Sequence, residues 1–324
     1  MPFPRRVGWL KGKYANVDGI PFTMPIATHD SPAMFAGFSI DAESAARMLP
    51  GQELHPVQVM GRGVLVLAVV NYVDTTIGKY VEFCIGILAS RGYEPPSALS
   101  SMLFRGRKGT GVYIYDLPVS TEISVKGGVG IWGMPKRQAS LDFLIGTDMV
   151  STQYDLDGQL VMRLDIPRPA NALVPLRLDG VGWGDARGML CKSYTHLQCK
   201  VGFHPGGGGK ARLLVGDHPR MDPIKRLDIN PRALFTGFAP RIEGVLDDHV
   251  ETWYLTADSP PAAPVNTLRE VADLTLSQQW LDPPDRVTSD RLMAALTPPE
   301  QVGRRSAPLE QLVTPQSADG RRAS

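Results

Sequence analysis

The sequence predicts an α+β protein dominated by a curled, predominantly antiparallel β-sheet with a few flanking helices. Its apolar residues fall mostly in short segments rich in β-branched and aromatic residues, and Gly, Asp, Thr or Pro residues separate these segments. Residues 190–203 alternate in character with a period of two, which is typical of a half-buried antiparallel strand. Strands and long helices do not follow one another regularly, so a doubly wound parallel sheet is not expected.

The first predicted element is a short helix over residues 39–49. Acidic residues stand near its start, strong helix formers fill its middle, and Pro50-Gly51 follows its end. Most of the chain that follows predicts strands, over residues 64–72, 80–89, 111–119, 141–146 and 158–166.

The alternating segment 190–203 sorts its side chains onto two faces. A zinc site built from its cysteines and histidines is not expected, because on a strand the two types point to opposite sides. The glycine-rich segment 204–211 predicts a hairpin turn, and Ala211 stands where a phosphate loop would need Ser or Thr for magnesium. The first predicted face carries Cys191, Ser193, Thr195, Leu197, Cys199, Val201 and Phe203, and the second carries Lys192, Tyr194, His196, Gln198 and Lys200.

The composition changes near residue 256 and predicts the domain organisation. Residues 1–255 are expected to form the β-rich domain. Residues 256–281 read as a Pro-rich linker followed by one docked helix, in which Thr267 and Glu270 have the spacing of a capping box. Pro, Arg, Gln and Ser dominate residues 282–324, so we expect a disordered tail there.

Charge and cysteine content exclude several classes of partner. A formal net charge of +1 gives no electrostatic reason to expect nucleic acid or a membrane surface as partner. The first residues lack the apolar core of a signal peptide, and the longest aliphatic run, Val64 to Val70, is too short to span a bilayer. Three cysteines are too few for a disulfide framework. We therefore expect a cytoplasmic protein.

The segment "IWGMPKRQAS", residues 131–140, places Lys136 after an apolar run and before a second cation, Arg137. A nucleophilic lysine must be neutral, and lowering its pKa from ~10.4 to near 7 requires about 4 kcal/mol of selective destabilisation of the ammonium. Arg137 could supply part of this by charge repulsion, and burial among the apolar neighbours would supply the rest. From the Lys-Arg pair alone, the ordinary interpretation is two surface charges at the entrance to a strand.

The longer pattern resembles the acetoacetate decarboxylase superfamily, whose signature is Gly or Ala, any residue, Pro, Lys, Lys. Here it stands as Gly133-Met134-Pro135-Lys136-Arg137. Three further segments are similar to the family in the same order, and the resemblance covers about residues 30–245. These segments are the early helix "DAESAARMLPGQEL", the stretch "NYVDTTIGKYVEF" and the late segment "ARLLVGDHPRMDPIKRLDI".

This resemblance implies a cone-like antiparallel β-barrel with helices outside and the lysine inside. It implies that Lys136 forms a Schiff base with a ketone, that Arg137 tunes the lysine, and that no metal or other cofactor is needed. It also implies a homo-oligomer. The family's acidic position falls on Asp74, with Thr76 as a rival, and Glu82 is a second candidate acid from the same region. Each acid could equally be a solvated charge.

Two departures from the family leave the substrate open. The arginine expected before the first helix has no counterpart in "HDSPAMF", and the expected Arg-Glu pair is replaced by Val129-Gly130. The leading hypothesis is a lysine-dependent decarboxylase of a β-keto acid. A second is a lysine-dependent aldolase or dehydratase acting on a pyruvate-like ketone. A third is a non-catalytic barrel that binds a small molecule.

Overall fold

The computed structural model describes residues 5–92, 109–169, 174–186 and 188–256. The chain divides into two units, Met1–Pro261 and Ala262–Ser324, and all described residues belong to the first. The docked helix and tail predicted after residue 256, and all of the linker except Thr256, lie outside the described residues and stay predictions. Among the helices in the described ranges, none has the length and apolar character that a membrane span requires.

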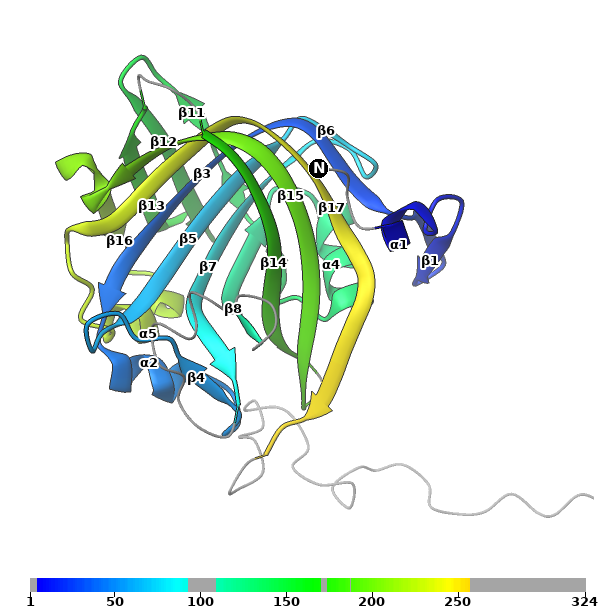
Figure 1. Ribbon diagram of the computed structural model, residues 1–324, viewed down its shortest axis with the longest axis horizontal. Coiled ribbons are helices and arrows are strands. Elements are labelled where there is room, and N and C mark those ends of the chain that lie inside the picture. The colour runs from blue at the N-terminus through cyan, green and yellow to red at the C-terminus, as the bar shows by residue number, and fades with distance from the viewer. Residues whose placement is uncertain (1–4, 93–108, 170–173, 187, 257–324) are drawn as a thin grey trace, which may run out of the picture. The chain divides into compact units, whose positions relative to one another are not determined.

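Seven strands of the described chain form a closed barrel (Figure 1). The neighbours in this barrel are antiparallel, except that β14 and β8 run parallel where they close the ring. This confirms the predicted fold, a predominantly antiparallel barrel with few helices. In spatial order the strands are β7 (Tyr80–Arg91), β5 (Gly63–Tyr72), β3 (Ile26–Ile40), β17 (Ala233–Tyr254), β15 (Met189–Pro205), β14 (Val174–Ala186) and β8 (Thr110–Val119).

Three short strands extend the barrel wall. One of them, β9 (Lys136–Gln138), pairs in parallel with β8 and carries the two cations of the motif. The others are β4 (Leu54–Pro56), which pairs with β7, and β6 (Asp74–Thr75), which pairs with β3. A separate hairpin joins β1 (Tyr14–Val17) to β2 (Ile20–Thr23).

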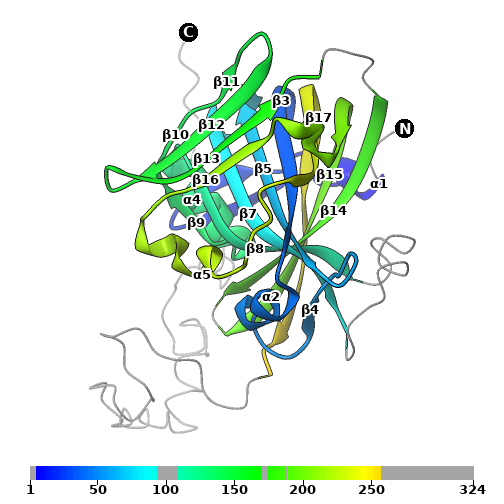
Figure 2. The same cartoon turned by 90° about the vertical axis from the view of Figure 1, so that its left-hand side faces the viewer.

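A smaller sheet packs beside the barrel wall formed by β5 and β7 (Figure 2). The main apolar core lies between the two sheets and includes Phe38, Leu67, Phe83, Tyr154 and Met162, all without exposed surface. The smaller sheet contains β10 (Ser140–Leu141), β11 (Leu144–Ile145), β12 (Met149–Leu156), β13 (Gln159–Pro167) and β16 (Arg212–Val215). The single strand expected over residues 141–146 is therefore two short strands.

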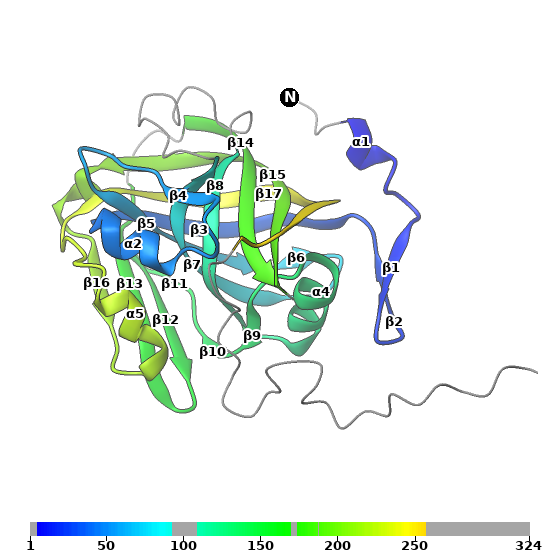
Figure 3. The ribbon, with the colours of Figure 1, turned by 90° about the horizontal axis from the view of Figure 1, so that it is seen from below.

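Short helices close the end of this core. Helix α2 (Ala42–Met48) begins after Asp41, whose side chain accepts a hydrogen bond from the Ser44 amide at 2.8 Å. It lies beside α5 (Asp222–Lys225), as Figure 3 shows, and the Asp41 amide donates to the Leu227 carbonyl at 2.7 Å. Residues 39 and 40, expected in the helix, end β3 instead. The remaining helices are α1 (Arg5–Gly8), α4 (Glu122–Trp132) and the 3-10 turns Gly206–Gly209 and Pro219–Met221.

Strand β15 corrects one sequence expectation. The alternation predicted a half-buried strand, but Lys192 and His196 on its polar face are only 9% and 8% exposed. Neighbouring carboxylates offset the cost of burying these groups. Lys192 Nζ lies 3.1 Å from Glu251 Oε1, and the His196 ring contacts the carboxylates of Asp179 and Asp247 at 2.8 and 3.3 Å.

Candidate active site

The motif glycine makes the turn that places Lys136. Helix α4 ends at Trp132, and Gly133 follows in the left-handed conformation with φ 65°. Its amide donates to the Val129 carbonyl at 3.1 Å, and a Cβ at this position would lie 2.9 Å from the Ala186 Cβ. After Pro135 the chain enters β9, where Lys136 pairs with Leu117 of β8. The turn thus packs α4 against β9 (Figure 3).

A second glycine lets α4 lie directly on the lysine side chain. A Cβ built on Gly128 would be 2.3 Å from Lys136 Cδ and 2.7 Å from Cε, so any larger residue collides with the lysine stem. The glycine-rich segment "KGGVG" therefore belongs to a helix that covers Lys136. It is not the nucleotide-binding loop that crowded glycines otherwise indicate.

The Lys136 amine is buried and makes two polar contacts. Only 5% of the side-chain surface is exposed, and Nζ lies 2.6 Å from Glu82 Oε2 on β7. The amine also donates to Ser124 Oγ of α4 at 3.0 Å. The Tyr80 ring lies 5.5 Å from Nζ. The Lys-Arg pair alone suggested a surface charge. The structure shows instead a buried amine beside a carboxylate.

Two tyrosines stand around Glu82. The Tyr72 hydroxyl donates to Glu82 Oε1 at 3.4 Å, and the rings of Tyr72 and Tyr80 stack with centroids 4.5 Å apart. Burial raises the pKa of both phenols well above the ordinary value, and the Glu82 charge adds to the effect. Both tyrosines therefore stay protonated at neutral pH, and Tyr72 is a hydrogen-bond donor to the carboxylate.

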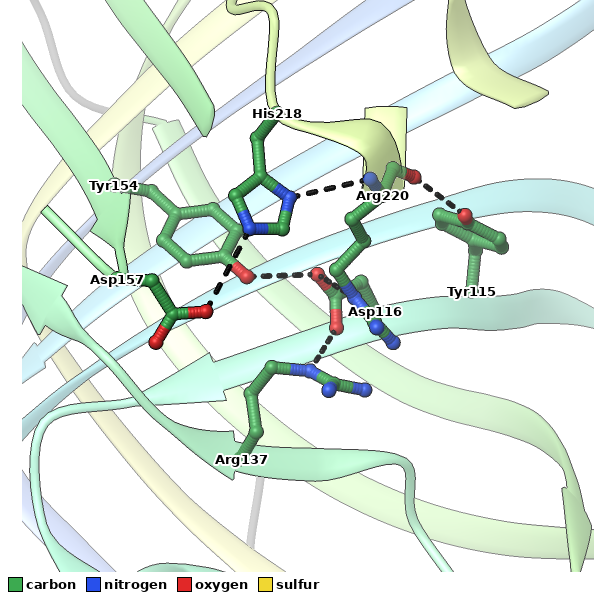
Figure 4. Close-up of polar contacts among 7 residues, drawn as sticks. All are labelled: Tyr115, Asp116, Arg137, Tyr154, Asp157, His218 and Arg220. Carbon is green, nitrogen blue, oxygen red and sulfur yellow. Dashed lines mark hydrogen bonds and ion pairs between the residues drawn. The ribbon is translucent and has the colours of Figure 1, made fainter. Parts of the chain in front are cut away.

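Arg137 turns away from Lys136 toward the core between the two sheets. Its Nε lies 2.8 Å from Asp116 Oδ1, and the Asp116 side chain has no exposed surface (Figure 4). Successive residues on an extended strand point to opposite faces, which explains why the two cations separate. Within the described chain, no contact joins Arg137 to Lys136. The tuning role expected for Arg137 stays a prediction.

Asp74 and Thr76 are not brought to the lysine. Both residues are exposed where β6 pairs with β3, and Asp74 stands opposite His29. Thr76 exchanges two hydrogen bonds with the backbone of Ala27. Of the two acids from this region, the structure places Glu82 beside Lys136, and within the described residues it shows no contact between Asp74 and Lys136. Any catalytic role of either acid stays a prediction.

Sequence reasoning did not single out Ser124, Tyr72 or Tyr80. The tyrosines lie in the stretch "NYVDTTIGKYVEF", so the segment was identified but not these members of it. Pairing of β5 with β7 places Tyr72 opposite Tyr80, and this register could not be read from one segment. Ser124 carries no motif signal, since its position depends on how α4 packs over β9.

The arrangement has the parts that imine chemistry requires. A buried amine is a nucleophile once it loses a proton, and Glu82 is within hydrogen-bond distance to accept that proton. Ser124 fixes the direction of the amine, and Tyr72 holds the carboxylate.

Two acetoacetate decarboxylase structures agree with this architecture, and a third protein is less similar. The crystal structure of acetoacetate decarboxylase from Legionella pneumophila superposes with a TM-score of 0.53 at 16% identity, covering 76% of this chain and 90% of that one. A second acetoacetate decarboxylase structure gives 0.50 at 16% identity, covering 71% and 89%. The enduracididine biosynthesis enzyme MppR complexed with pyruvate gives 0.49 at 14% identity, covering 70% and 90%.

A comparison with curated protein sequences gave no match. The family model for acetoacetate decarboxylase (ADC) matches residues 16–235, which is more than half of the chain and includes α4, β9 and the whole Lys136 site. The chain belongs to the acetoacetate decarboxylase family.

Proposed function

We propose that this protein is a decarboxylase of a β-keto acid that forms a Schiff base on Lys136. The observation that carries the proposal is the buried Lys136 amine, 2.6 Å from Glu82 and 3.0 Å from Ser124, in a chain of this family. Lys225 also lies 2.6 Å from a carboxylate, that of Asp217, but its side chain is partly exposed, so the burial of Lys136 is what distinguishes this amine.

In the proposed reaction, the neutral amine attacks the ketone carbon and water leaves to give an iminium ion. The C–C bond to the carboxylate then breaks and releases carbon dioxide. The electron pair of this bond moves toward the iminium nitrogen and gives an enamine. Protonation at carbon and hydrolysis release the ketone and the free amine. Glu82 accepts the proton from Lys136 before attack and returns a proton when the carbinolamine loses water.

The iminium nitrogen is the electron sink in this mechanism, so it requires no metal, flavin or pyridoxal group. The electrons stay within substrate and lysine, and carbon dioxide and a ketone are the products. We propose a small-molecule keto acid or ketone as the partner, and a cytoplasmic homo-oligomer as the form in which the protein works.

Reductive trapping tests the proposal. The protein is incubated with a panel of β-keto acids and borohydride, which reduces an iminium to a stable secondary amine, and peptide mass spectrometry locates the adduct. Lys192 is an internal control because it is also nearly buried and lies 3.1 Å from a glutamate. We expect the adduct on Lys136, and none in Lys136→Ala. An adduct on Lys192, or no adduct with any ketone, contradicts the proposal and favours a non-catalytic binding barrel.

One observation supports a second candidate function in the same site. A carboxylate beside the reacting amine can remove an α-proton from an iminium, which is the first step of an aldol or dehydration reaction on a pyruvate-like ketone. Carbon dioxide release from β-keto acids supports decarboxylation. Deuterium exchange at the α-carbon of pyruvate, without carbon dioxide release from any β-keto acid, supports the second candidate.

A further inference from the structure

Figure 4 shows a cluster of two arginines around one buried carboxylate. Arg137 follows Lys136 on β9, and successive side chains of a strand point to opposite faces. Arg137 Nε lies 2.8 Å from Asp116 Oδ1, and Arg220 Nε lies 3.0 Å from Asp116 Oδ2. The Tyr154 hydroxyl also donates to Oδ2 at 3.0 Å. Asp116 comes from β8, Arg137 from β9, Tyr154 from β12 and Arg220 from the turn before α5, so the fold assembles the cluster from four separate segments.

The charges of this cluster do not balance. The two guanidinium groups share the single carboxylate that they contact, which leaves one positive charge in excess at that contact. Two further carboxylates near the cluster, Asp157 and Asp222, are exposed. The Asp116 side chain is fully buried, whereas the side chains of Arg137 and Arg220 are 31% and 26% exposed. The carboxylate therefore anchors both cations from the core side, and part of each arginine remains open to solvent.

Arg137 Nε donates a hydrogen bond to Asp116 Oδ1, whereas Arg220 Nε is paired with Oδ2 by charge and has no hydrogen-bond partner among the described residues. Among the described residues, the Nη groups of both arginines make no hydrogen bond. A guanidinium presents its donors in a rigid planar fork, and its Nη groups suit the oxygens of carboxylate and phosphate. Two such forks, held by the same carboxylate, present their free donors close together.

The position of Arg220 is fixed by further contacts (Figure 4). Its amide donates to His218 Nδ1 at 3.1 Å, and its carbonyl accepts from the Tyr115 hydroxyl at 2.7 Å. The other His218 nitrogen lies 3.8 Å from Asp157, a carboxylate that is 82% exposed. The backbone that carries Arg220 is thus anchored before any ligand arrives, which lowers the entropic cost of binding.

We propose that Arg137 and Arg220 form a binding site for a small oxyanion, the carboxylate or phosphate group of a small molecule, separate from the Lys136 site. The excess positive charge supplies the attraction, the four free Nη groups supply the hydrogen bonds, and Asp116 holds the two forks in place. The proposal depends on the contacts of Asp116 and not on the reaction at Lys136.

Chemical modification of the wild-type protein tests the site directly. Phenylglyoxal modifies accessible guanidinium groups, and peptide mass spectrometry follows each arginine with acetate, inorganic phosphate or chloride added at equal ionic strength. We expect acetate or phosphate to slow modification of Arg137 and Arg220 in a saturable way and chloride not to. The exposed Arg232, which has no carboxylate partner among the described residues, is the control and should react equally in all three salts.

The acetate and phosphate experiments identify the ligand class. Protection by acetate indicates a carboxylate ligand, and protection by phosphate alone indicates a phosphate ligand. Equal rates in all three salts overturn the proposal. So does complete resistance of both arginines to the reagent, because the site requires solvent access.

A variant pair gives a second measurement. We expect Arg220→Gln to weaken the apparent affinity of the protective anion, measured by its effect on thermal unfolding, roughly tenfold or more, the loss expected for a charged hydrogen-bond donor. Arg232→Gln should leave the affinity unchanged. An unchanged affinity in Arg220→Gln overturns the proposal. If this variant does not fold, the modification rates on the wild-type protein decide.

Discussion

The two neighbouring cations of the motif lie in different surroundings. Lys136 faces Glu82, Ser124 and two tyrosines in a nearly buried site, whereas Arg137 faces a buried aspartate. Arg137 extends toward Asp116 and makes no contact with Lys136 among the described residues, which weakens the effect of its charge on the amine. Burial under α4 and the contact with Glu82 are therefore the main physical influences on the Lys136 amine.

Glu82→Gln tests the proton-transfer role of the carboxylate. The amide keeps the size and one oxygen of the side chain but cannot accept the Lys136 proton, so we expect iminium trapping at neutral pH to slow about a hundredfold. The measurement is the rate of borohydride-trapped adduct on Lys136. Glu122→Gln, an exposed glutamate in the first turn of α4, is the matched control and should trap at the wild-type rate. Faster trapping in Glu82→Gln would show that Glu82 acts mainly as a counter-ion to the ammonium.

The reactivity of the Cys84 thiol, which lies on β7 with Glu82, should depend on pH. Although the residue keeps some exposed surface, burial raises the pKa of its thiol to about 12, and the charges of Glu82 and Asp116 add to this. A thiol with a raised pKa is neutral below that value, and only the thiolate reacts. Alkylation of Cys84 should therefore rise about tenfold per pH unit from about pH 8 to about pH 10, without a plateau.

Iodoacetamide labelling read by mass spectrometry measures this dependence. Cys199 is the internal reference, because burial alone raises the pKa of its thiol, and we expect it to react faster than Cys84. A plateau in the Cys84 rate below pH 10 would mean that the thiol ionises more easily than its surroundings imply.

At the scale of elements, the site depends on one helix packing closely on one short strand. Helix α4 supplies Ser124 and the turn that leads into β9, and β9 is held by its parallel pairing with β8. Gly128 permits this contact because it has no side chain where the lysine stem passes. Glycines inside a helix lower its intrinsic stability, so close approach to Lys136 outweighs propensity here.

Gly128→Ala separates the two effects. Alanine should favour the isolated helix by about 1 kcal/mol, yet its Cβ would lie 2.3 Å from Lys136 Cδ and force the amine to move. We expect a folded protein, because the lysine stem can shift, with iminium trapping at least tenfold slower because the amine leaves Glu82 and Ser124. Thermal unfolding and the trapping rate are measured together.

Gly8→Ala is the matched control, since this helical glycine has nothing within 4 Å of a built Cβ. Its trapping rate should equal that of the wild type. A trapping rate in Gly128→Ala equal to that of the wild type would contradict the prediction. It would mean that the reaction does not depend on close packing of α4 on Lys136.

At the scale of the whole molecule, the β-rich character and most strands could be predicted from residue patterns. The strands 64–72, 80–89 and 111–119 match β5, β7 and β8 within two residues at each end, because these segments are short and rich in β-forming residues. The long strands β3 and β17 were not predicted, since Pro, Gly and charged residues interrupt their apolar pattern and bulges in their pairing absorb these residues.

Only the site residues that belong to a local sequence motif could be predicted. The Gly-x-Pro-Lys pattern identified Lys136, and the tyrosine segment led to Glu82, because both are local in the sequence. Ser124, Asp116 and Arg220 were missed because their roles depend on contacts between distant segments. Helix α4 was not predicted, because its glycines have low helix propensity. Packing against β9 stabilises the helix in the folded protein.

We expect the junction between β14 and β8, which closes the barrel, to be its least stable strand pairing. Strands β14 and β8 pair in parallel only at Gly182↔Val112 and Trp183↔Tyr113, whereas β3 and β5 pair without interruption from Ala33↔Val70 to Ile40↔Gly63. Fewer hydrogen bonds across a junction mean a lower free energy of local opening. Hydrogen exchange followed by mass spectrometry should therefore show faster exchange in peptides that cover residues 112–113 and 182–183 than in those that cover β5.

A substitution at the same junction should widen this difference. A Cβ on Gly111 would lie 2.4 Å from the Val181 carbonyl oxygen, so Gly111→Ala must push the two strands apart. We expect exchange in β8 and β14 to rise while exchange in β5 stays unchanged. Gly180→Ala, whose Cβ would meet its nearest atom at 3.6 Å, should leave the pattern as in the wild type. Equal protection of the β8–β14 junction and of β5 in the wild-type protein would show that barrel closure is as stable as its longest antiparallel pairings.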